Sequence, residues 1–247
     1  TGAATVPLVL DSSNPEALER GLKAADGKVL LNSVSGEEKS FSRILPLAKK
    51  YGAAVIGLTL DENGIPPTAA GRVAVAERIA HEAEKIGIPK RDVIIDCLTM
   101  TVSAEQKQAV ETLQAIRSVK SSVGLNTVLG VSNISFGLPC RQLMSATFFA
   151  MALEAGLDAA IINPKEKAMM DAWRAAMVLL QKDQRAAAYV EAYRDTTTVS
   201  APEAPVNLPA DVRGLLARSV INGDPEGVIS LVNQALEEGQ SPLQISN

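Results

Sequence analysis

Four polar side chains each follow a short apolar segment of this sequence. They are Asp11 after residues 6–10, Asn32 after 28–31, Asp96 after 93–95 and Asn133 within the segment TVLGVSNISFG at 127–137. Carboxylates accept hydrogen bonds from paired N–H donors, and asparagine amides offer both a donor and an acceptor. If the four side chains meet, they suit a flat heterocycle with an amidine-like edge, such as an aminopyrimidinone ring.

Each of these residues also has a purely structural interpretation. Asp11 could cap the helix that follows it, although Ser13 or Asn14 is better placed to do so. The two asparagines could stabilise turns. Asp96 precedes no immediate helix, which favours a functional role for it.

The elements that must position these side chains alternate strictly between strand and helix. Strands are predicted at 6–10, 28–31, 53–60, 93–95, 127–131 and 159–162, and helices at 16–25, 37–51, 68–86, 106–119, 141–155 and on to about 193. Strands that are apolar throughout are typical of parallel sheets covered by helices. A (β/α)8 barrel brings all its strand ends to one mouth, whereas a doubly wound sheet uses mainly its switch point. The sequence therefore favours an α/β barrel of the TIM type that is short of two β/α units, with the doubly wound sheet as the alternative.

The last fifty residues differ from this barrel pattern. We expect a barrel over 1–194, a linker rich in Thr, Pro and Ala over 195–210, and a short α-helical segment over 211–247. Helices are predicted at 211–222 and 225–238, and a third begins near Pro242. These helices have little core of their own, so we expect them to begin a second domain. The chain opens with Thr1, which predicts a piece of a longer protein or a processed product.

Composition excludes several classes of function. The net charge is −4 and the isoelectric point is about 5.2, and Lys and Arg are scattered, so neither a nucleic acid nor an anionic membrane is an expected partner. No apolar run is long enough to cross a membrane. Cys97 and Cys140 show no CxxC spacing, which fits a cytoplasmic location.

Other catalytic chemistries find little support. His81, the only histidine, lies within a predicted helix and is interpreted as structural. One histidine and two distant cysteines predict no metal site. Cys97 beside Asp96 could be a nucleophile, but a small buried hydrophobic residue is the favoured interpretation.

Six longer segments carry a family resemblance. They are LDSSNPEALERGLK (10–23), LNSVSGEE (31–38), GAAVIGLTLDENGIP (52–66), VIIDCL (93–98), TVLGVSNISFGLP (127–139) and GLDAAIINP (156–164). In this order they resemble the pterin-binding methyltransferase family, which includes methyltetrahydrofolate:corrinoid methyltransferases and the folate domain of cobalamin-dependent methionine synthase. The segment at 219–245 is similar to the start of the helical cap before a cobalamin-binding domain, which favours the methionine synthase branch.

The resemblance implies that the barrel lacks its first two β/α units. It also implies a reaction and roles for residues. Asp11, Asn32 and Asp96 would hold the pterin ring, and Asn133, with Ser132 beside it, would contact N5 near the methyl group. Arg141 falls where some relatives carry an arginine in the same loop. The implied substrate is 5-methyltetrahydrofolate, and the methyl acceptor is a cob(I)alamin or other corrinoid carried by a separate domain or protein. A second copy of the chain is a further candidate partner.

Two alternatives to this function remain open at the level of sequence. Dihydropteroate synthase shares the barrel and the pterin pocket, but its last strand ends in a basic motif with a histidine, where this chain reads AAIINPKEK at 159–167. The chain could also be a folate-binding fragment without turnover.

Overall fold

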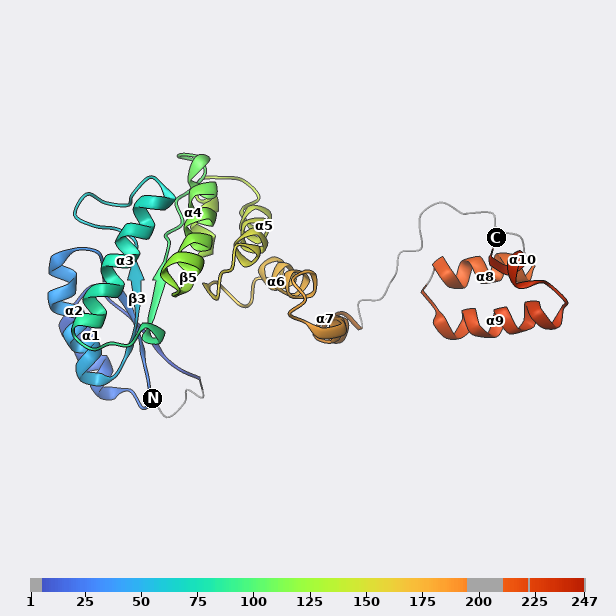
Figure 1. Ribbon diagram of the computed structural model, residues 1–247, viewed down its shortest axis with the longest axis horizontal. Coiled ribbons are helices and arrows are strands. Elements are labelled where there is room, and N and C mark those ends of the chain that lie inside the picture. The colour runs from blue at the N-terminus through green and yellow to red at the C-terminus, as the bar shows by residue number, and fades with distance from the viewer. Residues whose placement is uncertain (1–5, 195–210, 222, 247) are drawn as a thin grey trace. The chain divides into compact units, whose positions relative to one another are not determined.

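The computed structural model describes residues 6–194, 211–221 and 223–246. The chain divides into two compact units, Thr1–Tyr189 and Val190–Asn247. The first contains the sheet and the helices around it (Figure 1), and in the second the described residues form helices joined by turns. The predicted linker at 195–210 lies outside the described residues.

Six parallel strands form one sheet in the order of the sequence. They are β1 (Val9–Asp11), β2 (Leu30–Ser35), β3 (Ala54–Leu58), β4 (Val93–Asp96), β5 (Asn126–Gly130) and β6 (Ala159–Ile161). A doubly wound sheet reverses its strand order at a switch point, and this sheet does not. The first unit is therefore a TIM-like half-barrel, and the doubly wound alternative is wrong. That two further units complete the barrel stays a prediction.

A helix follows each strand, largely within the predicted bounds. The helices of the first unit are α1 (Pro15–Ala24), α2 (Glu38–Tyr51), α3 (Ala69–Lys85), α4 (Lys107–Ser118), α5 (Arg141–Glu154) and α6 (Lys167–Leu179), followed by α7 (Ala187–Tyr193) at the unit boundary. Gly52 ends α2 with a φ of 67°, a left-handed conformation in which glycine is not strained. The Thr68 hydroxyl caps α3 by accepting from the Gly71 N–H at 3.2 Å.

The core lies between the sheet and these helices. Leu31, Val55, Ile95 and Leu129 come from the four central strands and are fully buried there. The edge strands depart from the prediction of burial on both faces, because Val9 in β1 is 53% exposed and Ile161 in β6 is 47% exposed. Edge strands of an open sheet lack a neighbour on one side, which explains this exposure.

The second unit confirms the predicted helices to within one residue at each end. They are α8 (Val212–Ile221), α9 (Pro225–Glu237) and α10 (Pro242–Ser246). Asp224 caps α9 by accepting from the Gly227 N–H at 2.9 Å, and Ala235 of α9 is buried. In the described parts of both units, every helix is too short or too polar to span a membrane.

Candidate functional site

Strand register places three of the predicted site residues on one face of the sheet. Asp11 pairs with Asn32, and Asn32 pairs with Ile56. Two residues further along β3, Leu58 pairs with Asp96. Paired residues of neighbouring strands point to the same face, and side chains along a strand alternate with a period of two. Asp11, Asn32 and Asp96 therefore share the face opposite the helices, at the carboxyl ends of their strands.

Asp11 and Asn32 meet at a cavity of about 450 Å³. The Ser12 N–H donates to the Asn32 carbonyl at 3.1 Å, which fixes the ends of β1 and β2 beside each other. The cavity is lined by the strand ends and by the first turns of α2, including Ser33, Ser35, Leu58, Lys39 and Arg43. Asp96, Ser132, Asn133 and Arg141 do not line it. The structure thus gathers the predicted residues into two groups.

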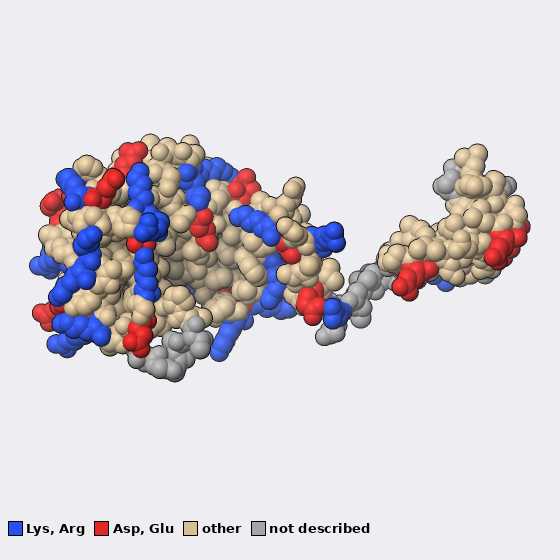
Figure 2. Space-filling model, turned by 60° about the horizontal axis from the view of Figure 1, so that its bottom comes forward, with Lys and Arg blue, Asp and Glu red and all other residues tan. Residues whose placement is uncertain are grey.

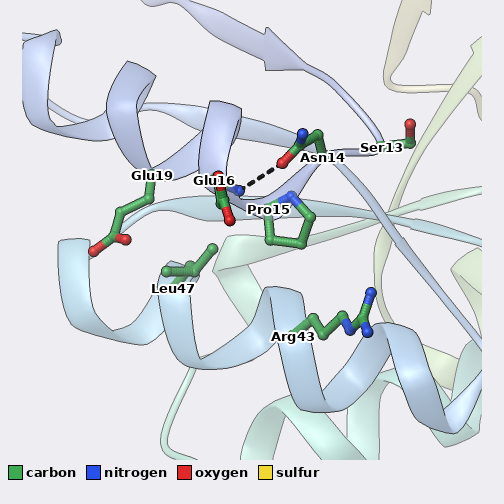
Figure 3. A pocket seen from close by; sticks show the side chains of 7 residues that line it. All are labelled: Ser13, Asn14, Pro15, Glu16, Glu19, Arg43 and Leu47. Atoms are coloured by element: carbon green, nitrogen blue, oxygen red, sulfur yellow. Dashed lines mark hydrogen bonds between the residues drawn. The ribbon is translucent and has the colours of Figure 1, made fainter.

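Asp11 is free of the capping role that the sequence left open. The Asn14 side chain caps α1 instead, accepting from the Glu16 N–H at 2.9 Å and the Ala17 N–H at 3.4 Å. Figure 3 shows this cap at a second hollow, of about 650 Å³, between α1 and α2. Asp11 is exposed at the end of β1, where its carboxylate can meet a ligand.

Asp96 is the buried member of the site, with 7% of its surface exposed. The Leu98 N–H donates to its Oδ1 at 2.8 Å. Burial raises the pKa of Asp96 to about 6, although the Leu98 N–H and the nearby Arg72 cation both oppose that rise. A carboxylate that is shielded from water in this way forms strong hydrogen bonds with any N–H donors that reach it, because the local dielectric constant is low.

Cys97 follows Asp96 but faces the opposite way, into the core, where it is fully buried. Burial, together with the Asp96 charge, raises the pKa of its thiol to about 12. A thiol in this state is a poor nucleophile, because the thiolate is the reactive form. The interpretation of Cys97 as a small buried hydrophobic residue is confirmed.

Asn133 lies on a short 3-10 helix, Val131–Ser135, directly after β5. Val131 and Ile134 are buried and anchor this turn, while Asn133 is exposed. The loop that follows Asp96 holds the turn in place. The Val102 N–H donates to the Ile134 carbonyl at 3.0 Å, and the Thr101 hydroxyl donates to the Phe136 carbonyl at 2.6 Å. The loops that carry Asp96 and Asn133 are therefore fixed to each other.

Arg141 binds the loop that carries Asn133. Its Nε donates to the Ser135 hydroxyl at 3.1 Å, and its Nη2 donates to the Ser132 carbonyl at 3.2 Å. The guanidinium also lies 4.4 Å from the centre of the Phe136 ring, within the range of a cation–π contact. In the structure, Arg141 and Ser132 therefore contribute to the conformation of the loop that carries Asn133.

Two buried polar residues next to Asp96 escaped the sequence prediction. Thr99 is 8% exposed, and its hydroxyl has no hydrogen-bond partner within the described parts of the chain. Arg72 of α3 is fully buried and binds the turn after Asp96. Helical spacing could have predicted the burial of Arg72, because this residue shares the buried face of α3 with Val75, Ala76 and Ile79.

The other polar groups that the structure describes form no competing centre. His81 is exposed on α3. No three side chains of the metal-binding types gather in the described ranges. Basic and acidic side chains lie interspersed on the face of the larger unit that Figure 2 shows.

Comparisons with known proteins bear on the family and the fold of the chain. The family described as "Pterin binding enzyme" matches residues 1–163. Methionine synthase of Mycobacterium tuberculosis is 33% identical over 270 aligned residues, which cover 99% of this chain but only 23% of that protein. Methylcorrinoid:tetrahydrofolate methyltransferase of Eubacterium limosum is 32% identical over 197 residues, which cover 78% of this chain and 72% of that protein. Dihydropteroate synthase from Thermus thermophilus, solved with 4-aminobenzoate, shares the fold, with a TM-score of 0.56 at 20% identity over 70% of this chain and 71% of that chain.

Proposed function

This chain belongs to the family of pterin-binding enzymes, and from that premise we propose that it transfers the methyl group of 5-methyltetrahydrofolate to a cob(I)alamin or related corrinoid. The relatives that match by sequence are methyltransferases. The chain spans 23% of the length of the methionine synthase it matches, so the corrinoid would be carried by another domain or another protein.

One observation carries the proposal: three hydrogen-bonding side chains lie on one face of the sheet at the carboxyl ends of β1, β2 and β4, and an exposed amide follows the next strand, β5. In this assignment Asp11, Asn32 and Asp96 hold the pterin ring. The carboxylates accept from its amino and ring N–H groups, and the amide pairs with its carbonyl and ring nitrogens. These partners supply direction as well as charge, which a planar heterocycle requires.

Asn133 is assigned to the methyl-bearing nitrogen. Neutral N5 is a poor leaving group, because it would take the electron pair of the breaking N5–methyl bond and leave as a strongly basic nitrogen anion. An amide N–H can hydrogen-bond the charge that develops there, while solvent or the pterin network provides the net proton. The corrinoid substrate supplies the electron pair for the new bond to the methyl carbon. The chain's own residues therefore orient the folate and stabilise its leaving nitrogen.

A transfer assay tests this function. The protein is incubated anaerobically with 5-methyltetrahydrofolate and free cob(I)alamin, and methylcobalamin is followed by absorbance. Formation that depends on the protein supports the proposal. Measurable folate binding without any transfer would support a folate-binding fragment instead.

Asn133→Ala separates binding from chemistry in the same assay. We expect the rate of transfer from bound folate to fall about 100-fold or more, as on removal of other transition-state donors, and folate affinity to fall much less. Asn163→Ala is the matched control, because the Asn163 amide also follows a strand but accepts locally from the Lys165 N–H at 3.1 Å. A variant that loses folate binding but keeps its rate per bound folate would refute the role at N5.

Dihydropteroate synthase activity is the second candidate, favoured only by the shared fold. Its assay uses a dihydropterin pyrophosphate and 4-aminobenzoate in place of the methyl donor and corrinoid. Turnover of that pair, with no methyl transfer, would replace the proposed function.

A further inference from the structure

A buried arginine without a carboxylate partner lies on the helix side of the sheet, next to the turn that follows Asp96. Arg72 of α3 is fully buried, yet no carboxylate of the described residues accepts a hydrogen bond from it. Burial lowers the pKa of its guanidinium, which shows that its charge is kept at a cost. A buried charge without a direct ion pair calls for an explanation beyond packing.

The guanidinium of Arg72 binds three segments of the chain at once. Its Nη1 donates to the carbonyls of Cys97 and Leu98, at 3.1 Å each. Nε donates to the Pro66 carbonyl at 3.0 Å, before α3. Towards α4, Nη1 donates to the Thr112 hydroxyl at 2.7 Å, and Nη2 donates to the Gln108 side chain. Arg72 thereby fixes the turn after β4 to α3 and α4.

The turn that Arg72 holds has an uncommon backbone conformation. Leu98 has a φ of 58°, in the left-handed region that a leucine rarely adopts. In this conformation the Leu98 N–H reaches the Asp96 carboxylate at 2.8 Å. The two carbonyls that flank this N–H are the two that Arg72 binds. Contacts elsewhere must stabilise such a conformation, and Arg72 provides them.

We propose that Arg72 is a positioning residue for the folate site: it holds the Cys97–Leu98 turn so that the Leu98 N–H orients the Asp96 carboxylate towards the pterin ring. This inference rests on the proposed function. Arg72 lies on the helix side of the sheet and Asp96 on the opposite face, so it acts without touching the substrate. Its positive charge also favours the ionised form of Asp96, which the proposed ring contact requires.

The surroundings of the cluster limit what else can titrate there. The charged or titratable groups near Arg72 and Asp96 are Glu105 before α4, Glu111 in α4 and the Cys97 thiol. Glu111 accepts from the Ala69 N–H at 2.7 Å, and this hydrogen bond lowers its pKa. The Cys97 pKa lies near 12. Asp96 is therefore the group whose ionisation Arg72 should shift within the neutral range.

Two substitutions of Arg72 test the proposal in the full chain. Arg72→Met keeps most of the bulk but removes the charge and the hydrogen bonds, whereas Arg72→Lys keeps the charge but loses the planar fork of donors that reaches all three segments. For Arg72→Met we expect the Kd for 5-methyltetrahydrofolate to rise at least about tenfold, and the pH below which binding is lost to move upwards. Arg72→Lys should weaken binding but leave that pH close to the wild-type value. Arg78→Met is the matched control, because Arg78 lies on the same helix, where it forms exposed ion pairs with Glu38 and Glu62 and lies 5.3 Å from the centre of the Phe41 ring.

A double-mutant cycle distinguishes positioning from general support of the fold. In an Asp96→Asn background, Arg72→Lys should add little further loss of binding, because the two side chains act in one unit. Independent, additive losses would overturn the proposal, as would an unchanged pH profile in a folded Arg72→Met protein. If Arg72→Met does not fold, the cycle with Arg72→Lys decides. Failure of the wild-type protein to bind 5-methyltetrahydrofolate would refute the proposed function itself, which keeps the two outcomes distinct.

Discussion

Asp96→Asn should stabilise the ligand-free protein at neutral pH while it weakens folate binding severely. Burial raises the pKa of Asp96 from 3.8 to about 6, so the folded state favours the protonated form. A shift of about two pKa units corresponds to about 3 kcal/mol between the two protonation states. Asparagine resembles the protonated acid in shape, and its oxygen can still accept from the Leu98 N–H.

The sign of the pH dependence follows from proton binding in the two states. Between about pH 4 and pH 6, the folded protein holds more protons at Asp96 than the unfolded chain does. The contribution of Asp96 to the free energy of unfolding therefore falls as the pH rises through this window. The gain in Asp96→Asn should grow from about 1 kcal/mol at pH 4.5 to about 3 kcal/mol at pH 8.

Urea unfolding at pH 4.5 and pH 8 measures this gain. Trp173, the only tryptophan, lies in α6 of the first unit, so its fluorescence reports on the half-barrel. Asp11→Asn is the control, because its carboxylate is exposed and its replacement should leave stability nearly unchanged at both pH values. An Asp96→Asn protein that is less stable than wild type at pH 8, or whose gain does not grow with pH, would refute the account of Asp96 as a costly buried charge.

Three further changes test other parts of the structure. Arg141→Met should slow methyl transfer about tenfold or more with a smaller effect on folate affinity, because the loop bearing the amide loses two hydrogen bonds; equal effects on rate and affinity would contradict this. Gly36→Ala should destabilise by about 1–3 kcal/mol in urea unfolding, because its Cβ would lie 2.7 Å from a backbone oxygen, whereas a Cβ at Gly130 meets only an amide nitrogen at 3.5 Å and should be tolerated. A thiol reagent should modify exposed Cys140 quickly in the native protein and Cys97 only on unfolding, as mass spectrometry of the labelled chain can show.

Elements with strong periodicity could be predicted from the sequence alone. The buried positions of α2, namely Phe41, Ile44, Leu45 and Ala48, follow the helical period. Apolar strands with polar ends also favoured a barrel-like arrangement, and the sequential strand order agrees with it. Periodicity succeeds here because each element buries one face against the same core.

The geometry around Asp96 could be predicted only in part. The strand end located the carboxylate, and parallel register explains why it shares a face with Asn32. The left-handed backbone conformation of Leu98 could not be predicted from its residue type, because leucine seldom adopts that conformation. The partners of Arg72 depend on this turn, so they could not be assigned before the turn was known.

The direction of Arg141 also depends on three-dimensional context. Its place near the Asn133 loop was expected from the resemblance, as a residue of the pterin site. Its guanidinium instead binds the loop through Ser135 and the Ser132 carbonyl. A long flexible side chain can reach either the ligand or the loop, and sequence spacing does not distinguish the two.

The difference in burial between Asp96 and Asn133 fits the different roles that the proposed methyl transfer assigns to these two residues. Asp96 is 7% exposed, whereas Asn133 projects from an exposed turn. A ring that must be held in one orientation benefits from a carboxylate shielded from water, since the hydrogen bonds to it are then stronger. The methyl group, in contrast, must remain accessible to a corrinoid, which is a large substrate. The amide proposed to serve the methyl-bearing nitrogen therefore has to lie on the open side of the site, and hydrogen bonds from the Asp96 loop keep its turn in place there.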